Sequence, residues 1–377
     1  MNRNARSAPR LLGIGTALPR HSSTQERVLD FMLRVLESSG SVSTSDRIAD
    51  LTRRIYRGSG VERRQSVIVD FDRDDPMDFE FFPRHPALEP FPTTERRMRV
   101  YEAESIVLAE EAARRALRRA GVPPESITHI VVSTCTGFFA PGLDVLLVER
   151  LGASRSVERT VIGFMGCYAG LTALRAADRI ARADPGALVL VVAVELCTLH
   201  YQKRPEPDLI VANALFSDGA AAAVVGGDHA GNGGRCGRLL ALRSGYAPES
   251  LEQMTWRIGD HGFEMRLAAE VPATLRSAAA PFVDSLLVDA GRAREDVRAW
   301  AAHPGGPRIL SAIDEALSLE RGALDSSRSV LRDHGNMSSA TIFFVIEREL
   351  ARRSEGTLVA LAFGPGLTIE GAVVDLD

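Results

Sequence analysis

A cysteine set between glycines is the first feature of this sequence that could do chemistry. Cys167 lies in Gly-Phe-Met-Gly-Cys-Tyr-Ala-Gly (163–170), and an apolar, alanine-rich stretch with helical spacing follows at 171–183. The glycines favour a sharp turn from a strand into that helix. A thiol at a helix start feels the positive end of the helix dipole, so we expect the pKa of Cys167 to fall from about 8.5 toward neutrality, especially beside a histidine. The alternative is a buried, inert cysteine.

Two later residues could assist such a thiol. His303 follows a predicted strand at 297–302, and Asn336 follows a glycine in a turn that enters an apolar helix. An imidazole can stabilise a thiolate as an ion pair, and an imidazole N–H with an amide N–H can hold a developing oxyanion. Taken singly, His303 could be a core or loop histidine, and Asn336 a turn or helix-capping residue. Together with Cys167 they predict a nucleophilic catalytic site.

The elements that would position these residues recur along the chain. Two helices predicted from apolar spacing end at Gly121 and Gly291, which are 170 residues apart, and the predicted strands 188–194 and 358–363 repeat at the same offset. Such self-similarity indicates a duplicated α/β unit. We therefore expect two halves, residues 1–230 with the nucleophile and residues 231–377 with His303 and Asn336, joined at the glycine-rich stretch 226–237. The repeat brings Cys167 and Asn336 to related helix starts that face one cleft.

Further elements follow from local pattern. The apolar run 11–18 predicts a buried strand; its Gly-Ile-Gly lacks the third glycine of a dinucleotide-binding loop, which argues against a Rossmann unit. Residues 25–38 have helical spacing, and the proline- and phenylalanine-rich segment 76–92 predicts an irregular but packed loop.

Composition excludes several function classes. The chain has 377 residues, 45% hydrophobic and 25% charged, with a net charge of −4, which gives no pull toward nucleic acid or an anionic membrane. Lys203 is the only lysine and lies in a polar, proline-flanked stretch, which argues against a Schiff-base enzyme or a lysine-dependent phosphate loop. The four cysteines have no CxxC spacing and follow no signal peptide, so we expect reduced thiols, a cytoplasmic protein and no membrane span. Cys197 and His200 lack companion metal ligands, and no metal site is expected.

Five segments in order carry a resemblance to a known family. They are Gly-Phe-Met-Gly-Cys-Tyr-Ala-Gly (163–170), Ala-Leu-Phe-Ser-Asp-Gly-Ala-Ala-Ala (214–222), His-Pro-Gly-Gly-Pro-Arg-Ile-Leu (303–310), Gly-Asn-Met-Ser-Ser-Ala (335–340) and Gly-Pro-Gly-Leu-Thr-Ile-Glu (364–370). The chain resembles the type III polyketide synthases, the chalcone synthase-like enzymes, from residue 12 to near its C-terminus. The resemblance implies a thiolase-like αβαβα sandwich of two halves, a homodimer, and an acyltransferase that uses acyl-CoA and malonyl-CoA as substrates without a cofactor.

The resemblance also assigns roles to individual residues. Cys167 matches the nucleophile that takes the starter acyl group, while His303 and Asn336 match the pair that assists loading, decarboxylates malonyl-CoA and stabilises the enolate. Phe216 matches an aromatic gate between the CoA tunnel and the cavity; without the resemblance it could equally be a strand-core aromatic. Met265 stands where plant members have a second gate phenylalanine.

Three kinds of position bear on substrate binding. Arg54 and Arg57 fall where the family has basic residues for the CoA phosphates, although a solvated helix face is the alternative. Trp256 occupies a position that is glycine in plant members and should reshape the cyclisation cavity. Cys135, at a threonine position, could form the pocket wall, be a second reactive thiol or only be buried; we expect the wall.

The departures from the plant pattern resemble the bacterial branch of the family, which includes enzymes that make alkylpyrones and alkylresorcinols. We therefore expect iterative decarboxylative condensation of malonyl-CoA onto an acyl starter on Cys167, followed by cyclisation. The nearest alternative is a single-condensation enzyme similar to ketoacyl synthase III. A papain-class hydrolase and a non-catalytic CoA-binding relative are the remaining alternatives.

Overall fold

The fold is described from a computed structural model, which covers residues 8–40, 46–227, 236–248, 250–352 and 355–376. Its centre is a nine-stranded sheet in the order β11-β12-β13-β8-β1-β7-β6-β4-β5. The expected boundary between residues 230 and 231 lies outside the described residues.

The sheet consists of two groups of strands with matching topology. The first group is β1 (Arg10–Ala17), β4 (His129–Thr134), β5 (Glu158–Gly163), β6 (Leu188–Leu196) and β7 (Asp218–Gly226). The second group is β8 (Gly237–Tyr246), β11 (Val297–Ala302), β12 (Gly356–Gly364) and β13 (Thr368–Leu376). In both groups a parallel pair, β4 with β6 or β11 with β12, is followed by an antiparallel neighbour, β7 or β13. A short antiparallel contact between β1 and β8 joins the groups.

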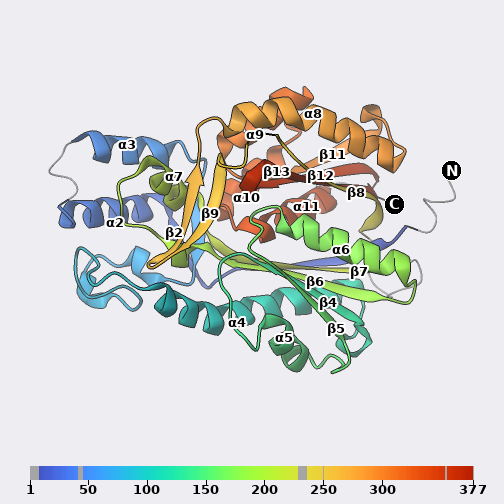
Figure 1. The fold of residues 1–377 in the computed structure, drawn as a ribbon, viewed down its shortest axis with the longest axis horizontal. Helices are drawn as coiled ribbons and strands as arrows, with labels where there is room; N and C mark the ends of the chain where they lie inside the picture. Colours follow the sequence, from blue (N-terminus) through green and yellow to red (C-terminus); the bar gives the residue numbers. More distant parts are fainter. Residues whose placement is uncertain (1–7, 41–45, 228–235, 249, 353–354, 377) are drawn as a thin grey trace.

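The helices form three layers, one on the outer side of each group of strands and one between the two groups (Figure 1). The outer layers are α4 (Thr94–Ala120) with α5 (Leu143–Leu151), and α8 (Val271–Ala290) with α9 (Pro307–Leu317). The helices α6 (Ala169–Ala183) and α11 (Thr341–Arg352) lie in the middle layer between the two groups of strands. The predicted αβαβα sandwich of two duplicated halves is confirmed.

Period-two alternation in the strands explains how each group of strands packs against two helix layers. Ile130 and Val132 of β4 belong to the hydrophobic core beneath α4, while Val131 between them belongs to the core around α6 and α11. In β12, Leu358 faces that same middle core and Val359 the core beneath α8 and α9. All of these side chains are fully buried, so the sequence of each strand is apolar on both faces.

The Gly-Ile-Gly of β1 has a packing role. A Cβ atom on Gly15 would lie 2.3 Å from the carbonyl oxygen of Ala112, so glycine lets the alanine-rich face of α4 approach the strand closely. The repeated helix ends are also as expected, because Gly121 and Gly291 end α4 and α8 in the left-handed conformation, with φ of 62° and 63°. The segment 76–92 is irregular, with its phenylalanines buried.

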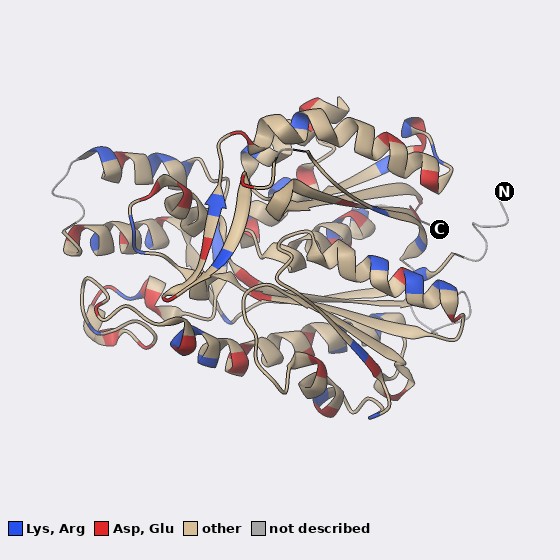
Figure 2. Ribbon diagram, in the orientation of Figure 1, with Lys and Arg blue, Asp and Glu red and all other residues tan. Residues whose placement is uncertain are grey.

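Additional elements gather at one end of the sandwich, on the left in Figure 1. They are α2 (Gln25–Ser38), α3 (Asp46–Arg57), α7 (Pro207–Leu215), the pair β2 (His21–Thr24) and β3 (Arg63–Ser66), and the hairpin β9 (Met254–Gly259) and β10 (Gly262–Leu267). Charges of both signs are interspersed over the outer helices and loops (Figure 2). Among the described helices, none has both the length and the apolar character needed to cross a membrane.

Candidate active site

The predicted strand-turn-helix unit around Cys167 is present. β5 ends at Gly163, α6 begins at Ala169, and the turn between them holds Cys167, which is buried. Gly166 has a φ of 91°, and a Cβ atom there would lie 2.4 Å from Cδ of Pro365, so this turn requires glycine. The thiol therefore sits immediately before the N-terminus of α6.

Cys167, His303 and Asn336 line one cavity, which we call the first cavity. The Cys167 thiol points at Oδ1 of Asn336, with a sulfur–oxygen distance of 4.0 Å. The same Oδ1 accepts a hydrogen bond of 2.9 Å from the backbone N–H of Ser338, which leaves the amide NH₂ to donate to a substrate oxygen. His303 follows β11, and its backbone N–H donates to the carbonyl oxygen of Leu361 at 2.7 Å. The convergence expected from the repeat is thus observed.

The protonation state of the pair differs from the sequence-based expectation. Burial raises the pKa of Cys167 to about 12 and lowers the pKa of His303 to about 3. Both ring nitrogens of His303 are buried, and neither has a hydrogen-bond partner among the residues that the structure describes. The expected thiolate–imidazolium pair with a depressed thiol pKa is therefore wrong, because burial disfavours the charged form of each residue. The site holds a neutral thiol and a neutral imidazole.

Cys135 does not form the pocket wall that we expected, because its buried thiol packs against Glu195 and Ser338. Its Sγ is 3.3 Å from Oε1 of Glu195 and 3.2 Å from Oγ of Ser338. Cys135 lines neither the first cavity nor the second cavity next to it. Burial first, and then the charge of Glu195, raise the pKa of the Cys135 thiol well above its ordinary value. Glu195 is itself buried and accepts hydrogen bonds from the Cys135 N–H at 3.0 Å and the Thr136 hydroxyl at 2.8 Å.

A second cavity lies on the other side of Phe216. Phe216, Met265 and Ala212 line both cavities, so the two residues assigned to gate positions stand where the cavities meet. Trp256 lines the second cavity and is paired with Met265 across the β9–β10 hairpin. Its Nε1–H donates to the carbonyl oxygen of Cys135 at 2.8 Å, which fixes the indole in the wall.

His200, which the sequence suggested only as a metal ligand without companions, is a wall residue of the second cavity. Its ring stacks on Phe263, with centroids 4.1 Å apart, and meets Trp256 edge-on at 5.6 Å. Nδ1 accepts from the Phe263 N–H at 3.0 Å, so Nε2 carries the proton and donates to the carbonyl oxygen of Thr136 at 2.7 Å. Burial lowers the pKa of His200 to about 3, which keeps the ring neutral. This position of His200 in the cavity wall becomes visible only once the β9–β10 hairpin, which carries Trp256 and Phe263, is placed in space.

Arg54 and Arg57 lie apart from both cavities. They occupy the last turn of α3 and are exposed. Arg57 lines a separate open groove with four arginines of α10 (Asp325–His334) and α11, namely Arg328, Arg332, Arg348 and Arg352. The structure thus brings Cys167, His303, Asn336, Phe216, Met265 and Trp256 together, and it leaves the two arginines outside that group.

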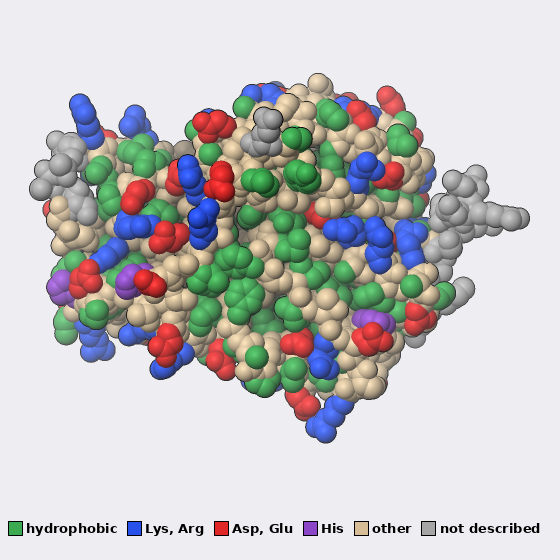
Figure 3. All heavy atoms as spheres, viewed as in Figure 1, with side chains coloured by type: hydrophobic (Ala, Val, Ile, Leu, Met, Phe, Trp, Pro, Cys, Tyr) green, Lys and Arg blue, Asp and Glu red, His purple; other side chains and the backbone are tan. Residues whose placement is uncertain are grey.

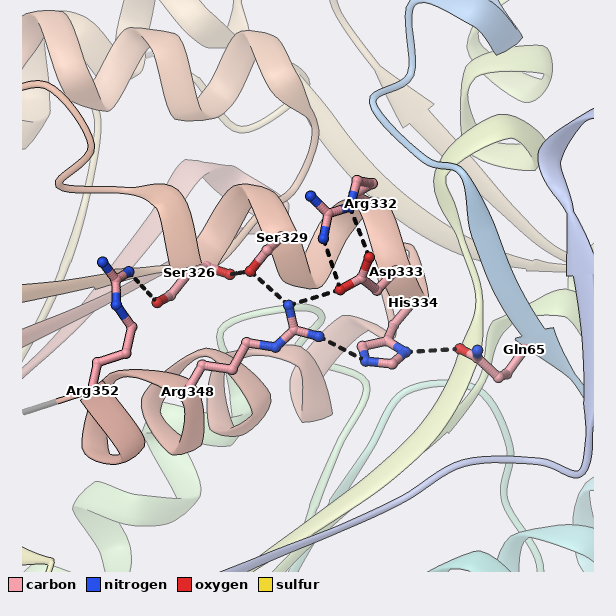
Figure 4. Close-up of polar contacts among 8 residues, drawn as sticks. All are labelled: Gln65, Ser326, Ser329, Arg332, Asp333, His334, Arg348 and Arg352. Atoms are coloured by element: carbon pink, nitrogen blue, oxygen red, sulfur yellow. Dashed lines mark hydrogen bonds and ion pairs between the residues drawn. The ribbon is translucent and has the colours of Figure 1, made fainter.

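A polar network holds the end of α10, immediately before Asn336 (Figure 4). Nη2 of Arg348 donates to Nε2 of His334 at 3.0 Å, so Nδ1 of His334 carries the proton and donates to Oε1 of Gln65 at 3.3 Å. Arg348 also binds Oδ2 of Asp333 at 3.0 Å. Burial, followed by the charge of Arg348, lowers the pKa of His334 to about 4, which favours this neutral arrangement.

The chain is similar to known proteins along nearly all of its length. Residues 1–229 match the family model of the N-terminal domain of chalcone and stilbene synthases, and residues 239–376 match that of the C-terminal domain. The alpha-pyrone synthesis polyketide synthase-like protein Pks18 of Mycobacterium tuberculosis is 33% identical over 97% of this chain and 90% of its own length. Bisdemethoxycurcumin synthase of Oryza sativa subsp. japonica is 34% identical over 97% of this chain and 91% of its own.

Two solved structures of polyketide synthases are similar to this chain in fold. PKS-I of the brown alga Ectocarpus siliculosus superimposes with a TM-score of 0.90 at 29% identity, covering 100% of both chains. The C-terminal type III polyketide synthase domain of Steely1 from Dictyostelium superimposes with a TM-score of 0.87 at 29% identity, covering 98% of this chain and 100% of that domain. With family models matched along both halves and relatives aligned over nearly the full length, the chain belongs to the chalcone and stilbene synthase family and is a type III polyketide synthase, an acyltransferase.

Proposed function

We propose that this enzyme loads an acyl-CoA starter on Cys167, extends it by repeated decarboxylative condensation with malonyl-CoA, and cyclises the product to an alkylpyrone, an alkylresorcinol or a related ring. The observation that carries the proposal is the first cavity. There, the buried thiol of Cys167 faces Asn336, and His303 offers two ring nitrogens with no protein partner. The similarity to the alpha-pyrone synthesis relative supports the pyrone as one product type.

In the loading step, the thiol proton of Cys167 passes to the neutral imidazole of His303. The sulfur attacks the thioester carbonyl carbon, the bond from that carbon to the CoA sulfur breaks, and CoA leaves as a thiol after taking the proton from His303. The imidazole is neutral, so one of its ring nitrogens has a lone pair that can accept this proton.

In the extension step, malonyl-CoA loses carbon dioxide, and the enolate oxygen accepts hydrogen bonds from the His303 ring N–H and the Asn336 amide. The enolate carbon then attacks the acyl carbonyl carbon, the bond to sulfur breaks, and Cys167 is released as a thiolate. The chain, now two carbons longer on CoA, can return to Cys167. Attack of a chain enol oxygen on the thioester carbonyl closes a pyrone and expels the thiol. The proposed reaction uses CoA thioesters as substrates and needs no metal or redox cofactor.

We propose that CoA binds at the surface beside α3. Arg57 is exposed and lines an open groove, and guanidinium groups bind phosphate well. We assign Arg57 and Arg54 to the CoA phosphates. Because reduced thiols and CoA thioesters suit the cytoplasm, we assign the reaction to that compartment.

We also propose a homodimer formed through β5. This strand is an edge of the nine-stranded sheet and is largely exposed, with Val161 at 50% exposure and the nearby Phe138 at 42%. Hydrophobic side chains gather at the centre of the face seen in Figure 3. Antiparallel pairing of β5 with its copy would satisfy the open backbone groups of that edge. Sedimentation at micromolar concentration tests this: a monomer contradicts it.

Mass spectrometry of the products tests the proposed reaction. The purified enzyme is incubated with malonyl-CoA and with acyl-CoA starters from acetyl to palmitoyl, with Cys167→Ala as the control. Triketide or tetraketide products that disappear in the control support iterative extension. Addition of one malonate only would indicate the single-condensation enzyme similar to ketoacyl synthase III, and release of free acid without malonate use would indicate a hydrolase.

A further inference from the structure

Arg97 is a buried cation at the beginning of α4. It lies in the first turn of this helix, and its exposed fraction is 0%. Burial lowers the pKa of Arg97 to about 9, and among the residues that the structure describes no carboxylate pairs with it. A buried charge without a counter-ion is costly, and an apolar side chain of similar length would fill the same space without that cost. The reason for a cation at this position must therefore lie in the groups that it binds.

The guanidinium binds backbone carbonyl oxygens on both sides of His200. Nη1 donates to the carbonyl oxygen of Leu199 and, at 3.2 Å, to that of Tyr201. Nε donates to the carbonyl oxygen of Pro92 at 3.1 Å. Because the N–H groups of a guanidinium have a rigid, planar arrangement, these bonds fix the backbone around His200 to the beginning of α4. The ring that forms part of the wall of the second cavity is thereby held from behind.

The turn of the β9–β10 hairpin is anchored at the same place. Gly262 has a φ of 99°, and a Cβ atom there would lie 3.0 Å from Cδ and Nε of Arg97, so glycine lets the turn pack closely against this side chain. The Gly262 N–H donates to the hydroxyl of Thr94, in the same turn of α4, at 2.9 Å. The N–H of the next residue, Phe263, donates to Nδ1 of His200 at 3.0 Å. Arg97 therefore contacts both segments that meet in this last hydrogen bond.

The charge of Arg97 supports the contact between His200 and Phe263. Nδ1 of His200 can accept the Phe263 N–H only while it carries no proton. Burial lowers the pKa of His200 to about 3, and the charge of Arg97 also lowers it. Arg97 thus acts on His200 in two ways, by holding the backbone on either side of it and by favouring the neutral ring.

We propose that Arg97 is a positioning residue for starter specificity, which holds His200 and the β9–β10 hairpin together and so sets the shape of the second cavity. The claim about specificity rests on the proposed function and on the acyl chain reaching this cavity. The wall that Arg97 holds includes Phe263 and Trp256, whose ring centroids lie 5.8 Å apart. A fixed wall distinguishes acyl chains by length, whereas a loosened wall adapts to several lengths.

The first arm of the test reports on the wall and needs no substrate. The chain has two tryptophans, so Trp300→Phe leaves the indole of Trp256 as the only one. Adding Arg97→Met should raise the acrylamide quenching constant of that indole about twofold or more, because a wall that has lost its anchor opens more often to solvent. Arg97→Lys, which keeps the charge without the planar fork, should restore part of the protection.

Arg96→Met, in the same Trp300→Phe background, is the matched control. Arg96 precedes Arg97 on α4, is exposed, and donates to the carbonyl oxygen of Phe81 instead. Quenching in this control should equal that of the Trp300→Phe background. Thermal unfolding identifies a variant that fails to fold, in which case Arg97→Lys decides.

The second arm measures kcat/KM for acetyl-CoA, hexanoyl-CoA and dodecanoyl-CoA as starters, with malonyl-CoA as extender. In Arg97→Met the ratio between the best and the poorest of these starters should fall about tenfold, which is the scale on which a fitted pocket distinguishes chain lengths. Decarboxylation of malonyl-CoA should stay close to the wild-type rate, because Cys167, His303 and Asn336 line the first cavity. A general loss of structure would instead lower all of these rates alike.

The outcomes separate this inference from the proposed function. Unchanged quenching in a folded Arg97→Met variant, or an equal rise in Arg96→Met, overturns the inference whatever the enzyme makes. Increased quenching with an unchanged starter ratio, or a wild type that does not distinguish the three starters, overturns the claim about specificity while the proposed function stands. If the wild type consumes no malonyl-CoA, the proposed function fails, and the claim about specificity fails with it. The quenching arm then judges only whether Arg97 holds the wall.

Discussion

Phe216 and Asn336 form an isolated parallel β-bridge between the two halves of the molecule. The Asn336 N–H donates to the carbonyl oxygen of Leu215 at 2.8 Å, and the Ser217 N–H donates to the carbonyl oxygen of Asn336 at 2.9 Å. Phe216, which lies between the two cavities, and Asn336, to which we assign a catalytic role, are therefore fixed to one another through the backbone. A shift of either residue is transmitted to the other.

The network of Arg348, His334 and Gln65 braces this bridge from outside. Gln65 exchanges two hydrogen bonds with Ser217, from its N–H to the Ser217 hydroxyl at 3.0 Å and from that hydroxyl to the Gln65 carbonyl oxygen at 2.9 Å. We predict that Arg348→Met lowers the kcat of malonyl-CoA decarboxylation about tenfold and leaves the starter KM within twofold, because a misplaced Asn336 weakens enolate stabilisation rather than starter binding.

Steady-state kinetics of carbon dioxide release checks this, and Arg348→Lys should restore part of the rate. Arg352→Met is the matched control, because Arg352 lies one turn further along α11 and bonds Ser326 at 3.1 Å. An equal loss in the control, or a change confined to KM, contradicts a positioning role for Arg348.

Replacing Trp256 by glycine should extend the range of starters. The indole occupies the wall of the second cavity, edge-on to His200 at 5.6 Å and Phe263 at 5.8 Å. We predict that Trp256→Gly raises the kcat/KM ratio of dodecanoyl-CoA to hexanoyl-CoA about tenfold, which is the effect of burying about two more methylenes at about 0.8 kcal/mol each.

The measurement is competition between the two starters with product analysis by mass spectrometry. Ile258→Gly on the same strand is the control, because Ile258 is 60% exposed and lines neither cavity. An unchanged ratio in Trp256→Gly would mean that the acyl chain does not enter the second cavity.

How much of this molecule could be predicted from sequence depends on whether the cause is local. Apolar periodicity set β11 at 297–302 and α2 at 25–38 correctly, because side-chain spacing alone determines which face is buried. The repeat of similar segments about 170 residues apart predicted that Cys167 and Asn336 converge. The place of His200 in the wall of the second cavity could not be predicted, because that cavity is enclosed by elements far apart in the chain. The sign of the Cys167 pKa shift was also wrong, since desolvation is set by tertiary packing and not by the residues next to the thiol.

Thiol reactivity in the free enzyme should keep rising with pH. Burial raises the pKa of Cys167 to about 12, so the thiolate fraction increases about tenfold per pH unit between pH 6 and 10. We predict that alkylation by iodoacetamide follows this increase without a plateau and that His303→Gln leaves the profile unchanged, because the imidazole is already neutral in that range. Intact-mass kinetics, with Cys167→Ala as the background, checks this. A plateau below pH 7 that disappears in His303→Gln would reveal an imidazolium–thiolate pair instead.

Stability should fall in acid partly because of His303. Burial lowers its pKa from 6.5 to about 3 in the folded state. Between those values the unfolded chain binds a proton that the folded chain does not, so the stabilisation is complete above pH 6.5 and is lost as pH falls toward 3. From pH 7 to pH 5 this one histidine should cost about 2 kcal/mol of unfolding free energy. We predict that His303→Gln loses about 2 kcal/mol less than the wild type over that interval in urea titrations, whereas His85→Gln, at an exposed histidine, loses as much as the wild type. Contributions from other buried groups, including His200, are common to the proteins and cancel in the difference. Equal losses in all three proteins would mean that His303 titrates normally in the folded enzyme, and a neutral general base at this position would then have to be abandoned.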